Sequence, residues 1–379
     1  MPLLPRHPLR IQPYFGHRSR ERLVISARAL RARDPGFGKR SRLRAMETMV
    51  RQFISHEVAG ITVKLEIAGS KGTLLSHEGI TDGEGFVHFD IAIDPHWDLP
   101  EHPVWEQGTL HWTNTEGPQA VEAHILAPGH ASNLAVISDI DDTIIETGIT
   151  GGLRSVLRNW QRVFAQMPHE RMAVPGADAF YGKLAGGMLD DGENRPVARI
   201  PATRRPFFYI SSSPWNLFSY LVAYQRLRGL PLGPLKLRDW GFNRSTFGKG
   251  SHGAHKDAAI SGILGMYPHM RFALIGDDTQ GDLPAFARAV EEHPGRIAAI
   301  FLRTVASETF SPEEQAARQR IVDTGVPLWM GDSYHEGEEF LRTVGFTPDG
   351  ETEQIVHAVD KSGDTNGDDT NEAGAVSGG

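Results

Sequence analysis

The chain has 379 residues, of which 40% are apolar and 23% charged, as in a folded protein with room for two domains. It contains no cysteine, which excludes disulfides, zinc–thiolate sites and a cysteine nucleophile. The net charge is −8, yet residues 1–50 hold twelve Lys and Arg against three Asp and Glu, so the remainder is clearly acidic.

The basic segment at residues 1–50 can attract an anionic membrane surface, although a solvated basic face is the alternative. No aromatic-basic signature accompanies the charge, so we expect no nucleic-acid partner. No run approaches the roughly 18 apolar residues needed to span a bilayer. We therefore expect a cytoplasmic protein whose membrane contact, if any, is peripheral.

Alternating apolar and polar residues dominate the first third of the chain. The pattern is clear in Ile61–Ile67, Val87–Ile91 and Val121–Ile125, with turn residues between the segments. Short alternating strands predict an antiparallel, β-sandwich-like domain over residues 1–129. The basic segment 34–51 reads as an insertion between its first two strands.

Beyond Pro128 the pattern changes to short, continuous apolar runs separated by segments of helical periodicity. The runs are Leu134–Ile137, Phe207–Ile210, Phe272–Ile275 and Ile297–Leu302. Strands that alternate with helices predict an α/β domain with a doubly wound, Rossmann-like parallel sheet over residues 130–350. Residues 351–379 form an acidic tail that is poor in apolar residues and is expected to be largely disordered.

The first of these runs leads directly into Asp139 and Asp141, two carboxylates two residues apart. In open α/β folds ligands bind at the carboxyl ends of the strands. Two carboxylates that close to each other favour a cation or a proton between them, and Mg²⁺ accepts one or two carboxylates together with a substrate phosphate. The pair also offers a nucleophile beside a proton-transfer group.

Further polar side chains follow the later runs. They are Ser211 after the second run, Lys256 at the start of a helix-like segment, and Asp277 and Asp282 after the third run. Each alone has a structural interpretation, as a helix cap, a surface lysine or a turn residue. Their order along the chain makes coincidence a poor explanation: the serine and the aspartates follow apolar runs, and Lys256 comes between the second and third runs.

This order of motifs resembles the haloacid dehalogenase (HAD) superfamily of phosphotransferases. A narrower likeness is carried by Ser138–Thr143, Tyr209–Trp215, His255–Lys256, Leu274–Asp277 with Asp282, and Pro294–Arg296 with Ile300 and Arg303. These residues resemble the catalytic domain of the actin-patch-associated phosphatidate phosphatase family. The resemblance covers residues 130–310 and extends more weakly to Pro13-Tyr14.

The resemblance implies that Asp139 is the nucleophile, forming an aspartyl-phosphate, and that Asp141 is the general acid and base. It implies Mg²⁺ as cofactor, held by Asp139, the backbone carbonyl of Asp141 and Asp277. Asp282 is expected to support that metal shell.

The same resemblance implies that Ser211 and Lys256 bind the equatorial phosphoryl oxygens. One departure is Asp278, where the family pattern leads us to expect a small residue such as serine. The extra carboxylate leaves open whether Asp278 joins the metal shell.

The resemblance favours a lipid phosphate, phosphatidate to diacylglycerol, as the substrate of a phosphoric monoester hydrolase. The 63 residues between Thr143 and Phe207 are too few for a large cap domain, which suits a bulky or interfacial substrate. A phosphatase acting on phosphoprotein, nucleotide or nucleic-acid ends is one alternative. A non-catalytic scaffold that binds partners through the β domain is another.

Overall fold

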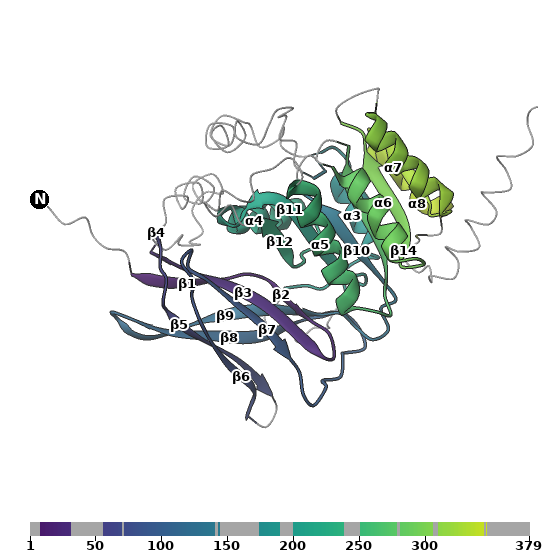
Figure 1. Ribbon diagram of the computed structural model, residues 1–379. Coiled ribbons are helices and arrows are strands. Elements are labelled where there is room, and N and C mark those ends of the chain that lie inside the picture. Colours follow the sequence, from purple (N-terminus) through teal and green to yellow (C-terminus); the bar gives the residue numbers. More distant parts are fainter. Residues whose placement is uncertain are drawn as a thin grey trace, which may run out of the picture.

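The computed structural model describes residues 8–31, 56–69, 72–140, 143–144, 174–189, 200–238, 251–278, 281–305, 310–344 and 346. The expected insertion at 34–51 and the expected tail at 351–379 lie outside these residues, as does most of the segment between Thr143 and Phe207. The described elements build two β-sheets, one from residues 9–127 and one from residues 134–331 (Figure 1).

The first sheet contains nine strands. They are β1 (Leu9–Pro13), β2 (Gly16–Arg18), β3 (Arg22–Arg31), β4 (His56–Glu57), β5 (Thr62–Gly69), β6 (Gly72–Ile80), β7 (Phe86–Ala92), β8 (Val104–Asn114) and β9 (Gly117–Ala127). The order is β1-β3-β2-β9-β8-β5-β6, and β4 and β7 also pair with β3.

All strand pairs in this sheet are antiparallel except β2 and β9. The alternating segments of the sequence lie in β5, β7 and β9, and their apolar side chains share one buried core. Alternation arises because successive side chains of a strand point to opposite faces. The sandwich-like arrangement of this region stays a prediction, because hydrogen bonds join the nine strands into a single sheet.

The second sheet contains six parallel strands. Their order is β12 (Leu235–Arg238), β11 (Phe207–Pro214), β10 (Leu134–Asp139), β13 (Arg271–Asp277), β14 (Ile297–Arg303) and β15 (Leu328–Gly331). The predicted α/β class with a parallel sheet is thus confirmed, and the four predicted runs are β10, β11, β13 and β14.

Helices cover both faces of this parallel sheet. This agrees with the sequences of its strands, which are apolar on both faces. One face carries α3 (Ala177–Leu184), α4 (Phe218–Arg228) and α8 (Tyr334–Thr343). The other carries α5 (Ser251–Met266), α6 (Asp282–Glu292) and α7 (Pro312–Asp323). None of the described helices is long and apolar enough to cross a membrane.

The strand order places β10 at the centre, with β11 and β13 as its neighbours on either side. The chain leaves β10 toward β11 and later returns to pair β13 with the opposite edge of β10. Crevices for ligands form at such reversals, outside the carboxyl ends of the strands. The fold therefore directs attention to the residues that end β10, β11 and β13.

The two sheets pack against each other through apolar and polar contacts. Tyr14 stands 4.4 Å from the ring of Trp215, which begins the 3-10 turn Trp215–Leu217 after β11. The Arg28 guanidinium donates to Asn216 Oδ1 at 2.6 Å, and His17 Nδ1 is 2.7 Å from the Tyr267 hydroxyl. Two of these contacts join the nine-stranded sheet to the chain immediately after β11, and the third joins it to the chain immediately after α5.

Candidate active site

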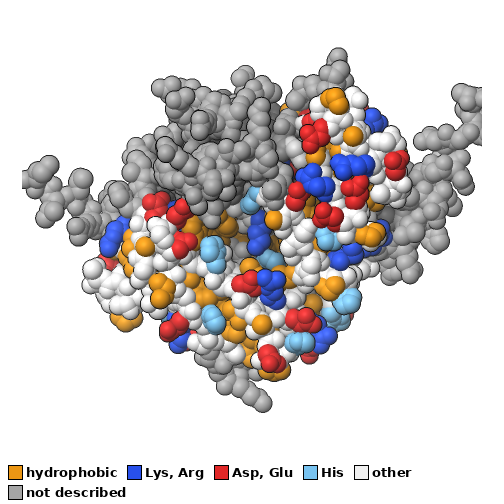
Figure 2. Space-filling model, viewed as in Figure 1, with side chains coloured by type: hydrophobic (Ala, Val, Ile, Leu, Met, Phe, Trp, Pro, Cys, Tyr) orange, Lys and Arg blue, Asp and Glu red, His pale blue; other side chains and the backbone are white. Residues whose placement is uncertain are grey.

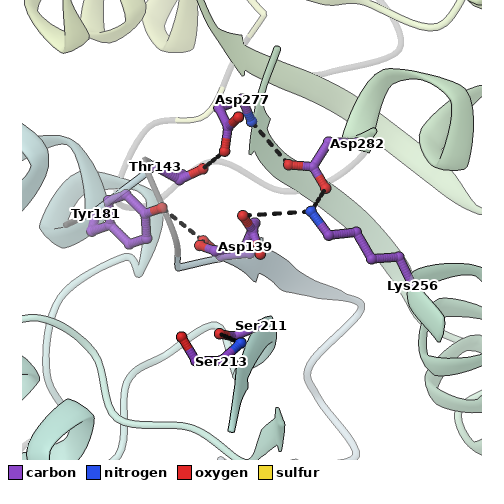
Figure 3. Close-up of polar contacts among 9 residues, drawn as sticks. Asp139, Thr143, Tyr181, Ser211, Ser213, Lys256, Asp277 and Asp282 are labelled. Atoms are coloured by element: carbon purple, nitrogen blue, oxygen red, sulfur yellow. Dashed lines mark hydrogen bonds and ion pairs between the residues drawn. The ribbon is translucent and has the colours of Figure 1, made fainter. Parts of the chain in front are cut away.

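Two carboxylates end the central strands of the parallel sheet. Asp139 is the last residue of β10 and Asp277 the last of β13, and the two strands pair up to Ser138 opposite Ile275. Asp139 is 3% exposed and Asp277 is fully buried. Both strands are buried along nearly their whole length and end at the edge of the core. The two carboxylates lie at that edge and face each other (Figure 3).

Asp282 joins them from the first residue of α6. The chain turns into this helix at Gly281, whose positive φ of 78° favours glycine. Asp282 Oδ2 accepts the backbone N–H of Asp277 at 3.0 Å. That bond clamps the end of β13 onto the start of α6.

Lys256 reaches the cluster from α5 and is buried with it. Its Nζ lies 3.5 Å from Asp139 Oδ2 and forms an ion pair with Asp282 Oδ1 (Figure 3). Burial alone would lower the pKa of Lys256, but the charges of Asp139, Asp282 and Asp277 raise that pKa above its ordinary value. The ammonium is therefore the cation already present in the site.

The cluster is rich in carboxylate oxygens. Asp139, Asp277 and Asp282 each offer an oxygen within 4.8 Å of the others, and Lys256 pairs with two of them, Asp139 and Asp282. Carboxylates this close to one another favour a cation between them, and a divalent ion held by oxygen ligands is one such cation. The donor set fits a hard metal ion such as Mg²⁺.

The three carboxylates differ in their contacts within the cluster. Asp282 holds Lys256 with one oxygen and the Asp277 N–H with the other. Asp277 Oδ2 accepts the Thr143 hydroxyl at 3.1 Å. Both oxygens of Asp282 are thus engaged by groups of the cluster, and the Asp277 carboxylate is oriented by Thr143.

Ser211 is brought to the same edge of the sheet. It follows Ile210, which pairs with Asp139 across β10 and β11. The Ser213 N–H donates to Ser211 Oγ at 2.9 Å, which fixes the hydroxyl oxygen where the pairing of β11 with β12 becomes irregular, between Ile210 and Pro214 (Figure 3). A hydroxyl near the end of a strand is suited to hold a phosphoryl oxygen.

Asp141 lies outside the described residues, so its role stays a prediction. Asp278 stabilises the backbone, because its Oδ1 accepts the Val305 N–H at 2.7 Å and its own N–H donates to the Arg303 carbonyl at 3.1 Å. It ties the end of β13 to the chain beyond β14. The described carboxylates that can share one ion do not include it.

Two buried tyrosines near the cluster were not anticipated from the sequence. Tyr181 of α3 lies 2.7 Å from Ser138 Oγ, and because that Ser138 hydroxyl donates to the Asp139 carbonyl, the tyrosine is the donor. Tyr334 of α8 donates to the Thr143 carbonyl at 2.8 Å. A tyrosine in an amphipathic helix carries no local signal that distinguishes such a contact from ordinary packing.

The buried carboxylates and Lys256 stand at the carboxyl edge of a parallel sheet, which is where α/β domains bind their ligands. Residues 134–304 match the family described as phosphatidate phosphatase APP1, catalytic domain. The curated relative named phosphatidate phosphatase APP1 of Saccharomyces cerevisiae is 32% identical over 170 residues, which cover 45% of this chain and 26% of the relative. Both matches support the family that the motifs resemble, for this part of the chain.

The match to the yeast protein spans about a quarter of that protein's length. The family match at residues 134–304 includes Asp139, Ser211, Lys256, Asp277 and Asp282. Among solved structures, a β-glucuronidase of Bifidobacterium dentium with coumarin-3-O-glucuronide is 8% identical, covers 86% of this chain and 61% of its own, and has a TM-score of 0.23. Bacteroides uniformis β-glucuronidase 2, covalently bound to cyclophellitol-6-carboxylate aziridine, is 9% identical at the same TM-score, covering 86% and 45%. Likeness at that score carries no weight for fold or function.

Proposed function

We propose that this protein is a HAD-like, Mg²⁺-dependent phosphatase that hydrolyses a phosphomonoester through an aspartyl-phosphate, with a lipid phosphate as its substrate. The observation that carries the proposal is the buried cluster of three carboxylates and Lys256 at the carboxyl edge of the parallel sheet. The match of residues 134–304 to phosphatidate phosphatase catalytic domains supports the reaction class.

Asp139 is the proposed nucleophile. Its carboxylate is 3.5 Å from Lys256 Nζ, so a phosphoryl group seated on Asp139 would lie within reach of the ammonium. In-line attack of a carboxylate oxygen on phosphorus forms the acyl phosphate and releases the alcohol. Asp141, two residues further, is the proposed acid that protonates the leaving oxygen and the base that then activates water.

Lys256 and Ser211 are proposed to bind the equatorial phosphoryl oxygens, which gain negative charge during transfer. Asp139, Asp277 and the backbone carbonyl of Asp141 would hold Mg²⁺, with Asp282 in support. When bound, the ion would neutralise phosphoryl charge and polarise the phosphorus–oxygen bonds. Asp282 contacts both Lys256 and the backbone N–H of Asp277. It therefore fixes the position of the ammonium relative to the end of β13.

The choice of a lipid phosphate rests on the similarity to the yeast phosphatidate phosphatase and on the narrower sequence resemblance. On the face seen in Figure 2, Lys and Arg side chains are mixed with Asp and Glu over the described residues. Contact with an anionic membrane stays part of the proposal through the basic segment at residues 1–50. Arg18 and Arg28 of that segment are buried and paired with Glu106 and Glu57, so they do not take part in it. The proposed domain limits are those predicted from the sequence, 1–129 for the β domain and 130–350 for the catalytic domain.

The test of the reaction is the variant Asp139→Asn, which keeps the size of the side chain and removes the nucleophile. We expect it to fold and to lose Mg²⁺-dependent turnover by several orders of magnitude, since the covalent route disappears. Asp90→Asn, which alters an exposed aspartate on β7 paired with Arg22, is the matched control and should stay active. Full activity of Asp139→Asn would overturn the assignment.

The substrate class is tested separately with phosphatidate in mixed micelles, an aryl phosphate and phosphopeptides, each with Mg²⁺ or with EDTA. The lipid proposal predicts the highest kcat/KM for phosphatidate. Turnover of soluble esters alone would favour a phosphatase for phosphoprotein or nucleotide ends. No turnover of any ester at high Mg²⁺ would favour a binding protein that acts through the β domain.

A further inference from the structure

Tyr334 is a fully buried tyrosine at the start of α8, beyond the segment that matches the phosphatidate phosphatase family. Its ring stacks on Phe180 at 4.7 Å and lies 6.3 Å from the ring of Trp329. The side chain thus has a fixed place between α3, α8 and β15. Its hydroxyl is the one polar group of this ring and points to the carboxyl edge of the sheet.

The hydroxyl is linked to the carboxylate cluster through one residue. Tyr334 donates to the Thr143 carbonyl at 2.8 Å, and the Thr143 hydroxyl donates to Asp277 Oδ2 at 3.1 Å. All three residues are buried, so water does not compete for these bonds. Thr143 is therefore held at its backbone by Tyr334 while its side chain orients Asp277.

In the bond between Tyr334 and Thr143, the tyrosine hydroxyl is the donor. Burial raises the pKa of Tyr334 above its ordinary value, so the hydroxyl keeps its proton and acts as a donor. A carbonyl can only accept. The chain of donors runs from α8, through the loop after β10, to the end of β13.

We propose that Tyr334 is a positioning residue for Asp277: by fixing Thr143, it orients the Asp277 carboxylate toward a bound divalent cation. The inference rests on the proposed function insofar as Asp277 is a metal ligand. It adds to the catalytic unit a segment of the chain, residues 312–344, that lies outside the family match. Groups that orient metal ligands in this way typically change metal affinity by roughly 10- to 100-fold when removed.

The test uses the full chain and the variant Tyr334→Phe, which keeps the ring and removes only the hydroxyl. The matched control is Tyr209→Phe, because Tyr209 is also buried and donates to a carbonyl, that of Pro231, at 2.7 Å. Mg²⁺ and Mn²⁺ dissociation constants are measured by calorimetry without substrate, and thermal unfolding is followed in EDTA. We expect roughly 10-fold weaker metal binding in Tyr334→Phe alone, with similar losses of thermal stability in both variants.

A double-mutant cycle separates positioning from general loosening of the core. Thr143→Val removes the bond to Asp277 and should weaken metal binding, while Thr143→Ser keeps a hydroxyl and should restore most of it. If Tyr334 acts through Thr143, adding Tyr334→Phe to Thr143→Val changes the metal affinity no further. Additive losses would show an independent effect and overturn the proposed route.

Equal metal affinities in the wild type and Tyr334→Phe, or equal losses in Tyr334→Phe and Tyr209→Phe, would also overturn the inference. Kinetics add a second readout: at saturating Mg²⁺ the kcat of Tyr334→Phe should recover, whereas the metal concentration at half activity stays raised. Because the calorimetry needs no substrate, absence of phosphatase turnover would reject the proposed function and leave the affinity comparison valid. A wild type that binds no divalent ion would reject both.

Discussion

Gly276 lies directly against the carboxylate of Asp282. A Cβ at residue 276 would stand 2.5 Å from Asp282 Oδ2 and 2.7 Å from its Cγ, closer than real Cβ contacts. The same carboxylate holds Lys256 and the Asp277 N–H, so it has no direction in which to move without breaking one of them. A residue without a Cβ is therefore needed at position 276 for the Asp282 carboxylate to keep its place in the site.

Gly276→Ala should displace Asp282 and separate Lys256 from the other carboxylates. We expect a loss of about 1–3 kcal/mol of stability from overpacking, and a fall in turnover of at least about tenfold, since the charged site is mispositioned. The measurements are kcat/KM on an aryl phosphate and denaturant unfolding. Gly265→Ala in α5, where a Cβ meets nothing within 4 Å, is the control and should gain up to about 1 kcal/mol.

Lys256→Met tests the charge balance of the cluster. Without the ammonium, three buried carboxylates lack their internal cation, and we expect the metal-free protein to lose about 3–5 kcal/mol of stability. Turnover should fall by about 10²–10³ if the ammonium stabilises the transferred phosphoryl group. Added Mg²⁺ should raise the melting temperature more in the variant than in the wild type, because Lys256 no longer offsets the charge of the carboxylates.

The control for that experiment is Lys183→Met, which removes a half-exposed lysine of α3 that pairs with Glu338. Exposed ion pairs contribute about 0–1 kcal/mol, so stability and its response to Mg²⁺ should stay near the wild-type values. An equal Mg²⁺ response in Lys256→Met and the wild type would contradict the view that the cluster binds a divalent ion.

The parallel sheet could be predicted where its strands are long and apolar on both faces. Central strands such as β10 and β13 are buried on both sides and read as continuous apolar runs. The strands β12 and β15 were missed because each has four residues, and the Leu-Lys-Leu-Arg of β12 alternates instead of forming a run. Edge strands contact fewer neighbours, and their sequences show the burial less clearly.

The candidate site was predictable to the extent that strand ends can be recognised in the sequence. Asp139, Ser211 and Asp277 directly end or follow apolar runs, and the parallel order brings them to one edge. Tyr334 could not be found in this way, because its partner Thr143 is 191 residues away and the contact depends on how α8 packs. Helix packing of that kind is set by the tertiary fold and leaves no local pattern.

Arg28→Met probes the contact between the two sheets. The buried guanidinium donates to Asn216 Oδ1 and to the Glu84 carbonyl at 2.9 Å, and it lies 4.3 Å over the ring of Phe86. Hydrogen bonds of a charged group contribute about 1.5–3 kcal/mol each, so we expect at least about 2 kcal/mol lower stability by urea unfolding. Arg20→Met, at an exposed pair with Asp98, is the matched control and should change stability by less than about 1 kcal/mol.

His17 makes the contact between the two sheets sensitive to acid. The ring is buried beside the Tyr267 hydroxyl, and its Nε2 has no hydrogen-bond partner among the described residues. Burial, with smaller effects from the charges of Lys236 and Arg22, lowers the pKa of His17 well below its ordinary value. The unfolded chain therefore takes up a proton near pH 6.5 while the folded chain does not.

The neutral His17 ring thus contributes stability that is complete above about pH 6.5 and is lost as the pH falls below that value, by up to about 1.4 kcal/mol per unit. His17→Gln removes the titrating group and should flatten this part of the profile, although the variant itself is less stable at pH 7.5. The measurement is urea unfolding at pH 7.5, 6.5 and 5.5, with His88→Gln, an exposed histidine of β7 beside Ser26, as control. A slope in His17→Gln as steep as that of the wild type would show that acid acts on the protein elsewhere.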